Sequence, residues 1–226
     1  MNYIKHQNMH KLTLLIFLIY SFSTAQNEFN AQGKRSGTWF GYHDNGGVKY
    51  SGEFIDGKET GIFKYYDYNG NLVIQLEYVE NGVRSQATLY YSNGALKSKG
   101  EYLNKEKHGS WLYYNLEGNI VGKENFSNGL LNGECQFFYE SGVLAEKYNY
   151  FNNLREGVSE IYYQSGYLNM RGQYHLDELE GDVEFYYDKI NQLESVGKYK
   201  MGLKDSIWIF FDKMGDTLDV YDYRRD

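Results

Sequence analysis

The chain has 226 residues and a formal net charge of −7, and it is 18% aromatic, with 25 Tyr, 13 Phe, 25 Gly and no Pro. Aromatic residues suit pleated surfaces, Gly supplies tight turns and Pro interrupts a strand ladder, so this composition predicts many short strands and excludes a mainly helical protein. The acidic balance opposes nucleic acid and anionic membranes, since both recruit clusters of Lys and Arg. We therefore expect no nucleic-acid partner and no membrane-lipid partner.

Residues 1–25 have the pattern of a secretory signal peptide. Lys5 and Lys11 stand ahead of an apolar run over residues 12–22, and Ser23-Thr24-Ala25 follows it. The run is too short to span a hydrocarbon core of about 30 Å as a helix. We expect cleavage near Ala25 and export to the periplasm or the exterior. Either Met1 or Met9 can be the start, because the signal pattern survives without the first eight residues.

Removal of residues 1–25 takes away two lysines and no acidic residue, which leaves 21 basic and 30 acidic side chains, a net charge of −9. Residues 26–36, which contain Gly33-Lys34-Arg35-Ser36, look like half a repeat unit and are expected to cap the start of a repeat region over residues 37–226. Cys135 is the single cysteine, so an internal disulfide cannot form in an oxidising compartment.

Residues 37–226 show a period of 24 residues. Gly, or Ser in two cases, opens units that start near residues 37, 61, 85, 109, 133, 157, 181 and 206. A second series of glycines begins at Gly46 and keeps the same period, with Asn191 in one position. Asn tolerates positive φ better than most residues, so Asn191 is expected to replace Gly there. One extra residue lies in the turn from Asp188 to Gln192.

Two columns of aromatic residues share this period. The first lies five positions into each unit and is named the aromatic stripe: Tyr42, Tyr66, Tyr90, Tyr114, Phe138, Tyr162, Tyr186 and Phe211. The second lies about seventeen positions in: Phe54, Tyr78, Tyr102, Phe126, Tyr150, Tyr174, Tyr199 and Tyr223. Such columns indicate equal units stacked side by side.

Each unit reads as two strands of about six residues joined by a tight turn, as in Trp111-Leu112-Tyr113-Tyr114 followed by a turn over residues 115–118. Eight units predict an all-β fold, an elongated open antiparallel β-meander of about sixteen strands. Neighbouring units should contact only each other.

Residues 52–66, Gly52-Glu53-Phe54-Ile55-Asp56-Gly57-Lys58-Glu59-Thr60-Gly61-Ile62-Phe63-Lys64-Tyr65-Tyr66, and the matching segment 100–114 resemble the MORN-repeat variant common in bacterial proteins. The resemblance covers about residues 33–223. It implies an open antiparallel sheet with a shallow groove. Some members of this family are labelled antitoxins of the YwqK type and others membrane-binding proteins, and the basic patches of lipid-binding relatives are missing from this sequence.

Alternation along a strand separates two faces. One face should be the better buried, and it collects Trp39, Phe63, Trp111, Cys135, Val183 and Trp208 with Tyr65, Leu89, Tyr113, Phe137, Ile161, Phe185 and Phe210. We expect an aliphatic row of the return strand to join it: Leu72, Leu96, Ile120, Leu144, Leu168 and Leu193. The aromatic stripe belongs to the other face. Its rings either shield the sheet or form a partner-binding surface.

No catalytic or metal-binding constellation emerges from the repeat, and we expect no cofactor. A polar row, Glu53, Glu77, Glu101, Asn125, Asn149 and Gln173, repeats across units and predicts a solvated column rather than an acid–base pair. His43, His108 and His175 occupy three different phases of the unit, whereas metal ligands converge on one point. Cys135 takes the place of Trp in other units, so it is expected to be buried.

The sequence therefore favours an exported non-enzymatic scaffold that binds a protein partner, with an immunity or antitoxin role suggested by the resemblance alone. The alternative is a carbohydrate-binding or envelope-structural module in which the tyrosines of the stripe stack on sugars.

Overall fold

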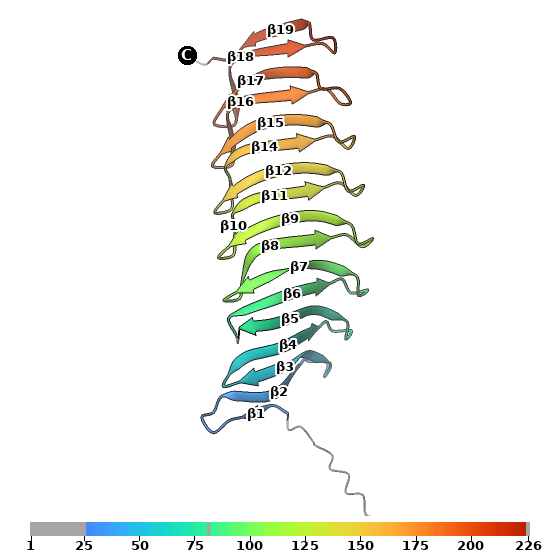
Figure 1. Cartoon of the computed structure of the whole chain (residues 1–226), viewed down its shortest axis with the longest axis vertical. Helices are drawn as coiled ribbons and strands as arrows, with labels where there is room; N and C mark the ends of the chain where they lie inside the picture. Colours follow the sequence, from blue (N-terminus) through green and yellow to red (C-terminus); the bar gives the residue numbers. More distant parts are fainter. Residues whose placement is uncertain (1–25, 81, 225–226) are drawn as a thin grey trace, which may run out of the picture.

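The computed structural model describes residues 26–80 and 82–224, and these residues form one open antiparallel sheet (Figure 1). The predicted signal peptide lies outside the described residues. Consecutive strands pair along the chain, with two exceptions: Leu130–Leu131 and Gly133–Phe138 both pair with Ile120–Ser127, and Leu154–Arg155 and Gly157–Tyr162 both pair with Leu144–Phe151. The sheet is therefore a meander that grows from its N-terminal end to its C-terminal end. The all-β prediction is confirmed. The described chain contains no helix, and hence none that could cross a membrane.

Nineteen strands follow from eight two-stranded units, the N-terminal strand β1 and two strands that are each broken in two. The strands are β1 Glu28–Phe29, β2 Arg35–Tyr42, β3 Val48–Ile55, β4 Lys58–Tyr66, β5 Leu72–Glu80, β6 Arg84–Tyr90, β7 Leu96–Leu103, β8 Glu106–Tyr114, β9 Ile120–Ser127, β10 Leu130–Leu131, β11 Gly133–Phe138, β12 Leu144–Phe151, β13 Leu154–Arg155, β14 Gly157–Tyr162, β15 Leu168–His175, β16 Glu178–Tyr186, β17 Leu193–Lys200, β18 Leu203–Phe211 and β19 Thr217–Asp222. Most have eight or nine residues and are thus longer than the six predicted.

The turn at the tip of each hairpin places one residue in the left-handed region. Gly46 has a φ of 83°, and its counterparts in the other regular units are close to this value. The turn with the extra residue differs, because Lys189 rather than Asn191 takes positive φ there. The expectation that Asn191 replaces Gly is therefore wrong: the inserted residue moves the left-handed position two residues earlier.

A bulge follows each tip and decides which face the return strand presents. Tyr65 pairs with Ile74, but Tyr66 pairs with Leu72, so Val73 is the extra residue, and the same shift recurs in every unit. Direct cross-strand partners lie on one face. The row from Leu72 to Leu193 therefore shares the face of the aromatic stripe, and the prediction that it joins the buried face is wrong.

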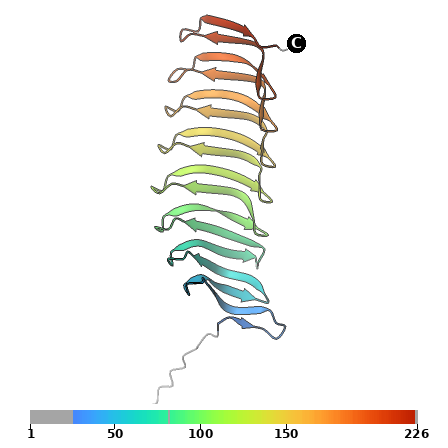
Figure 2. The ribbon, with the colours of Figure 1, turned by 180° about the vertical axis from the view of Figure 1, so that it is seen from behind.

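Burial is concentrated in one column, two residues into each unit. Trp39, Phe63, Ala87, Trp111, Cys135, Ser159, Val183 and Trp208 are all buried, and we call their side of the sheet the core face. The second aromatic column packs beside it, as in the edge-to-face contact of Trp111 with Tyr102, with ring centroids 5.1 Å apart. Figure 2 shows the ribbon from behind, and the described chain lays no second layer over either face.

The large members of the buried column lie directly on backbone of the preceding unit. A Cβ placed on Gly100 would stand 2.3 Å from the Trp111 ring, and one on Gly197 would stand 2.4 Å from Trp208. Both indole N–H groups donate to the carbonyl just after the glycine, over 3.1 Å to Glu101 and to Lys198. Glycine at these points is thus a requirement of close approach.

Where the glycine is absent, the sizes are exchanged. Leu76 faces Ala87, and Tyr148 lies opposite Ser159, so a large residue on the return strand meets a small one in the buried column. The two residues that meet at such an interface therefore fill a similar total volume. The larger of the two lies on the return strand in some units and in the buried column in others.

The N-terminal half unit covers the first ring of this column. β1 pairs with β2, the Phe29 and Trp39 rings meet edge to face at 5.1 Å, and the Trp39 indole donates to the Glu28 carbonyl over 3.1 Å. These contacts stand where the later repeats have contacts with a preceding unit.

We predict that Gly100→Ala lowers the free energy of unfolding by about 1–3 kcal/mol, because the new methyl group overlaps a ring that cannot move away. Gly122→Ala, whose Cβ would meet its nearest neighbour at 3.5 Å, is the matched control and should be near neutral. Urea denaturation followed by tryptophan fluorescence measures both. Equal stability of the two variants would contradict this packing of ring on backbone.

Candidate functional site

The structure places the predicted aromatic stripe on the face opposite the core, which we call the stripe face. Tyr42 is 55% exposed, and the other seven residues of the stripe are half-buried. All but the last pair directly with an aliphatic residue of the return strand, such as Tyr90 with Leu96, and Phe211 pairs with Thr217. Ile120 and Phe138 of successive units line one shallow depression, so the row continues from unit to unit.

A second row of side chains crosses the whole sheet beside the stripe. Consecutive cross-strand pairs connect it without a break, and we call it the middle row: Phe40, Ser51, Lys64, Gln75, Thr88, Lys99, Leu112, Lys123, Gln136, Lys147, Glu160, Arg171, Glu184, Val196, Ile209 and Val220. It holds five basic and two acidic residues. The sequence shows no such cluster because the members lie far apart along the chain.

The middle row touches the stripe. The Lys99 ammonium lies 5.8 Å from the centre of the Tyr114 ring, and that of Lys123 lies 5.4 Å from the Phe138 ring. Both distances are within the range of a cation–π contact. Positive charge therefore runs directly alongside aromatic surface on the stripe face.

The polar row predicted from the sequence lies one step further along the strands. Glu53 and Glu77 are exposed, whereas the Glu101 carboxylate accepts hydrogen bonds from Arg84 and Gln86. Asn125 and Asn149 donate to backbone carbonyls of the following strand, over 2.6 and 3.0 Å. These contacts join strands, and no two carboxylates of this row form a cleft in the described residues.

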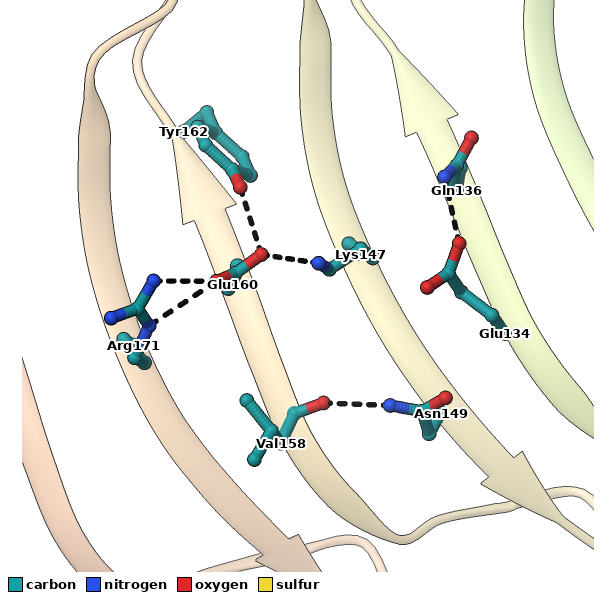
Figure 3. A network of polar contacts seen from close by, with 8 residues as sticks. All are labelled: Glu134, Gln136, Lys147, Asn149, Val158, Glu160, Tyr162 and Arg171. Carbon is teal, nitrogen blue, oxygen red and sulfur yellow. Dashed lines mark hydrogen bonds and ion pairs between the residues drawn. The ribbon is translucent and has the colours of Figure 1, made fainter.

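Glu160 is the centre of a network of polar contacts on this face (Figure 3). It is 7% exposed and forms an ion pair with Lys147, accepts hydrogen bonds from Arg171 at 2.9 Å and accepts one from the Tyr162 hydroxyl at 2.8 Å. Burial by itself raises the pKa of a carboxyl group, but these three partners outweigh it and lower the pKa of Glu160 to about 2. The group is ionised at neutral pH.

This network divides the stripe into two parts. The Tyr162 and Tyr186 hydroxyls donate to Glu160 and Glu184, over 2.8 and 2.6 Å, so both phenols are held by the sheet itself. No comparable glutamate stands three positions into the units of Tyr66, Tyr90 and Tyr114, where Lys64, Thr88 and Leu112 are found. The part of the stripe from Tyr42 to Phe138 is therefore the better candidate for contact with a partner.

The three histidines lie in different hairpins. His43 stacks on Tyr68 at the first tip, His108 pairs across strands with Glu101, and His175 forms an ion pair with Glu156 at 3.0 Å. The Nδ1 atom of His108 is buried without a hydrogen-bond partner among the described residues. No group of metal-ligating side chains was found within residues 26–80 and 82–224.

Cys135 is fully buried within the core face, as expected from its place in the Trp column. Burial raises the pKa of its thiol. A thiol kept protonated and out of contact with solvent is a packing residue, because the thiolate is the nucleophilic form.

A ladder of hydrogen bonds at the hairpin tips was not predicted from the sequence. The residue just after the stripe donates to the backbone carbonyl of the stripe residue in the next unit: Tyr91 to Tyr114 at 2.8 Å, and Tyr139 to Tyr162 at 2.7 Å. Tyr163 and Tyr187 do the same, and the Nε2 atom of His43 bonds to the Tyr66 carbonyl at 2.9 Å. The recurring Tyr at this phase was the available signal.

Comparison with known proteins finds one matching family, described as MORN repeat variant, over residues 35–56, 59–80, 86–104, 107–128 and 131–152. No curated protein matches the chain.

Similar solved structures include a mutant of S. aureus TarM in complex with Fondaparinux, alpha-GlcNAc-glycerol and UDP, with 10% identity, a TM-score of 0.33, and 42% of this chain and 19% of that chain covered. A second structure of TarM gives 11%, 0.31, 42% and 20%. A structure of TcdB2-TccC3-TEV gives 10%, 0.21, 84% and 15%. The chain spans one fifth or less of these proteins, and no functional argument rests on similarity at these TM-scores.

We predict that Glu160→Gln lowers the free energy of unfolding at pH 7 by about 1–3 kcal/mol, because it leaves Lys147 and Arg171 without their shared anion. The lowered pKa means that the carboxylate stabilises the fold above its unfolded value of 4.5 and loses this effect as the pH falls toward about 2. The difference between wild type and variant should therefore shrink at pH 3.

Chemical denaturation at pH 7 and pH 3 measures this effect. Glu134→Gln is the matched control, since Glu134 is exposed and bonds to Gln136 two residues along its own strand. A Glu160→Gln deficit that stays constant with pH would show that the carboxylate charge is not the cause.

Proposed function

The chain belongs to the MORN repeat variant family, and on that basis we propose that it is a non-enzymatic repeat scaffold that binds a protein partner on its stripe face. The observation that carries this proposal is the adjacency of the aromatic stripe and the basic middle row. Aromatic side chains supply large contact area at a low cost in conformational entropy, and charged neighbours select and orient the partner.

The composition of this face specifies the chemistry of the partner. Beside the part of the stripe from Tyr42 to Phe138, the middle row holds three lysines and no acidic residue: Lys64, Lys99 and Lys123. Although the protein is acidic as a whole, the surface beside the stripe is locally basic. It fits a protein surface that presents carboxylates next to apolar side chains.

A protein partner is favoured over a glycan because ring faces and hydroxyl groups of the stripe already have contacts within the sheet. Lys99 and Lys123 lie over Tyr114 and Phe138, which occupies faces that a sugar would stack on. The Tyr162 and Tyr186 hydroxyls are already hydrogen-bonded within the sheet. Binding of a glycan or a membrane lipid is thus an alternative outcome of the crosslinking experiment.

Photo-crosslinking in the native cells, with a crosslinking amino acid at Tyr90, followed by mass spectrometry, tests the proposal. We expect one dominant protein partner, whose capture falls about tenfold or more in Lys99→Glu plus Lys123→Glu and in Tyr66→Ala plus Tyr114→Ala. Lys58→Glu plus Lys200→Glu changes the charge equally away from both rows and should leave capture intact. Equal loss in the control, or binding to a glycan array or to lipid vesicles in place of a protein, would overturn the proposal.

We further propose that the protein is exported and cleaved near Ala25, as the pattern of residues 1–25 suggests. N-terminal sequencing of the protein from its own cells should then begin at or near Gln26. A chain that keeps residues 1–25 and stays in the cytosol would contradict export.

An immunity or antitoxin role is a special case of partner binding, and it requires that deletion of the gene be lethal beside an intact toxin gene and tolerated without it.

A further inference from the structure

The core face carries a recurring arrangement of one cation above several rings. It is built by the residue two positions before a unit start: Arg35, Lys107, Arg155 and Lys204. The Lys107 ammonium lies 4.7 Å from the Trp111 ring, 5.1 Å from Tyr113 and 4.7 Å from Phe126. The Lys204 ammonium lies 3.9 Å from the Trp208 ring. In these units the chain supplies both the cage of rings and the cation.

The unit that starts at Gly61 keeps the rings and lacks this cation. Phe63, Tyr65 and Tyr78 occupy the places of Trp111, Tyr113 and Phe126, two, four and seventeen positions into the unit. The place of Lys107 is taken by Glu59. The cage is thus preserved while the charge at its centre is reversed in sign.

A pocket of about 270 Å³ on the core face includes two of these three rings, Tyr65 and Tyr78, whereas Phe63 is not part of its lining. Glu59, Tyr65, Tyr78 and Tyr102 line it together with the aliphatic side chains of Ile74, Leu76 and Val83. The Glu59 side chain is only 20% exposed. Three tyrosines and a carboxylate around a small cavity are the groups that recognise an organic cation, because ring faces and carboxylate oxygens both carry negative charge.

The carboxylate of Glu59 acts on the surrounding phenols. Burial, and after it the charge of Glu59, raises the pKa of both Tyr65 and Tyr78. The phenols therefore remain neutral at physiological pH, and their ring faces remain available to a cation.

Lys105 also lines this pocket, on its solvent side. Its ammonium lies 3.2 Å from a carboxylate oxygen of Glu59, but its side chain is 71% exposed, and no ring contact of the kind made by Lys107 is found for it among the described residues. Because the lysine of this ion pair is largely in solvent, the pair contributes little free energy. Lys105 can turn to solvent when another cation enters the cage.

We propose that this pocket binds an organic ammonium group, which takes the place that Lys107 and Lys204 fill in their own units. The source of the group is either a small quaternary ammonium compound or the lysine side chain of a binding partner. Both share the chemistry of a compact cation with an apolar stem, and the experiment distinguishes them.

Titration of the protein with choline and with butylammonium, monitored by NMR shifts of the Tyr65, Tyr78 and Tyr102 ring signals, tests this proposal. 3,3-Dimethyl-1-butanol, the uncharged analogue of choline, serves as the probe without charge. We expect both cations to shift these signals and the neutral probe to bind about tenfold more weakly or not at all. Tighter binding of choline points to a quaternary ammonium ligand, and tighter binding of butylammonium points to a lysine side chain.

Glu59→Lys is the decisive variant, because it rebuilds the arrangement of Lys107 and fills the cage from within. It should abolish cation binding while leaving the protein folded. Glu53→Lys makes the same charge change on the exposed stripe face and should bind as the wild type does. The proposal is overturned if neither cation binds the wild type, if the neutral probe binds equally well, or if Glu59→Lys binds like Glu53→Lys.

Discussion

The contact on which the structure depends is the seating of one buried side chain of each unit on the return strand of the unit before it. A sheet with one layer has no second sheet or helix to bury its apolar side chains, so the units must bury one another's. Trp111 on Gly100 and Trp208 on Gly197 do this with a large ring on bare backbone, and Leu76 with Ala87 does it with the volumes reversed. The residue of the buried column is Trp in some units and Ala, Cys or Ser in others. This variation follows the size of the facing residue on the neighbouring strand and is not a loss of the repeat.

The same interfaces are closed at one end by hydrogen bonds from tyrosine hydroxyls to backbone carbonyls. The ladder of Tyr91, Tyr139, Tyr163 and Tyr187 at the tips donates to carbonyls one unit ahead, where the bulge interrupts regular pairing. A buried carbonyl left without a donor would cost about 1–3 kcal/mol. The tips that carry Tyr or His at this position thus supply a donor to the carbonyl that precedes the bulge of the next unit.

The period, the two-stranded unit and the large members of the buried column could be predicted from the sequence because they are fixed by local alternation and by repetition. The three strands beyond sixteen could not, because they are β1 and the two breaks that produce β10 and β13. The face on which the row from Leu72 to Leu193 lies could not be predicted. One bulged residue in each hairpin reverses the alternation, and no particular residue type marks the bulge in the sequence. The middle row was also invisible: Lys64 and Arg171 are separated by more than four units in sequence and belong to one line only through the register of every pair between them. Glu160 likewise gains its partners from two other strands.

The two faces of the sheet are stabilised by different contacts, and this difference indicates where a ligand or partner can bind. On the core face, the rings are covered by neighbouring rings and by cationic side chains of the chain itself. We therefore expect a unit to bind an external cation only where its own cation is missing, as at Glu59. On the stripe face, cohesion is supplied by cross-strand pairs and by the network around Glu160, which is confined to the later units. The earlier units lack this network, and there basic side chains of the middle row lie beside rings of the stripe, as Lys99 does beside Tyr114. A repeat scaffold gains specificity in this way through departures from its own consensus, because a surface repeated without change would offer every ligand eight equivalent places and select none of them.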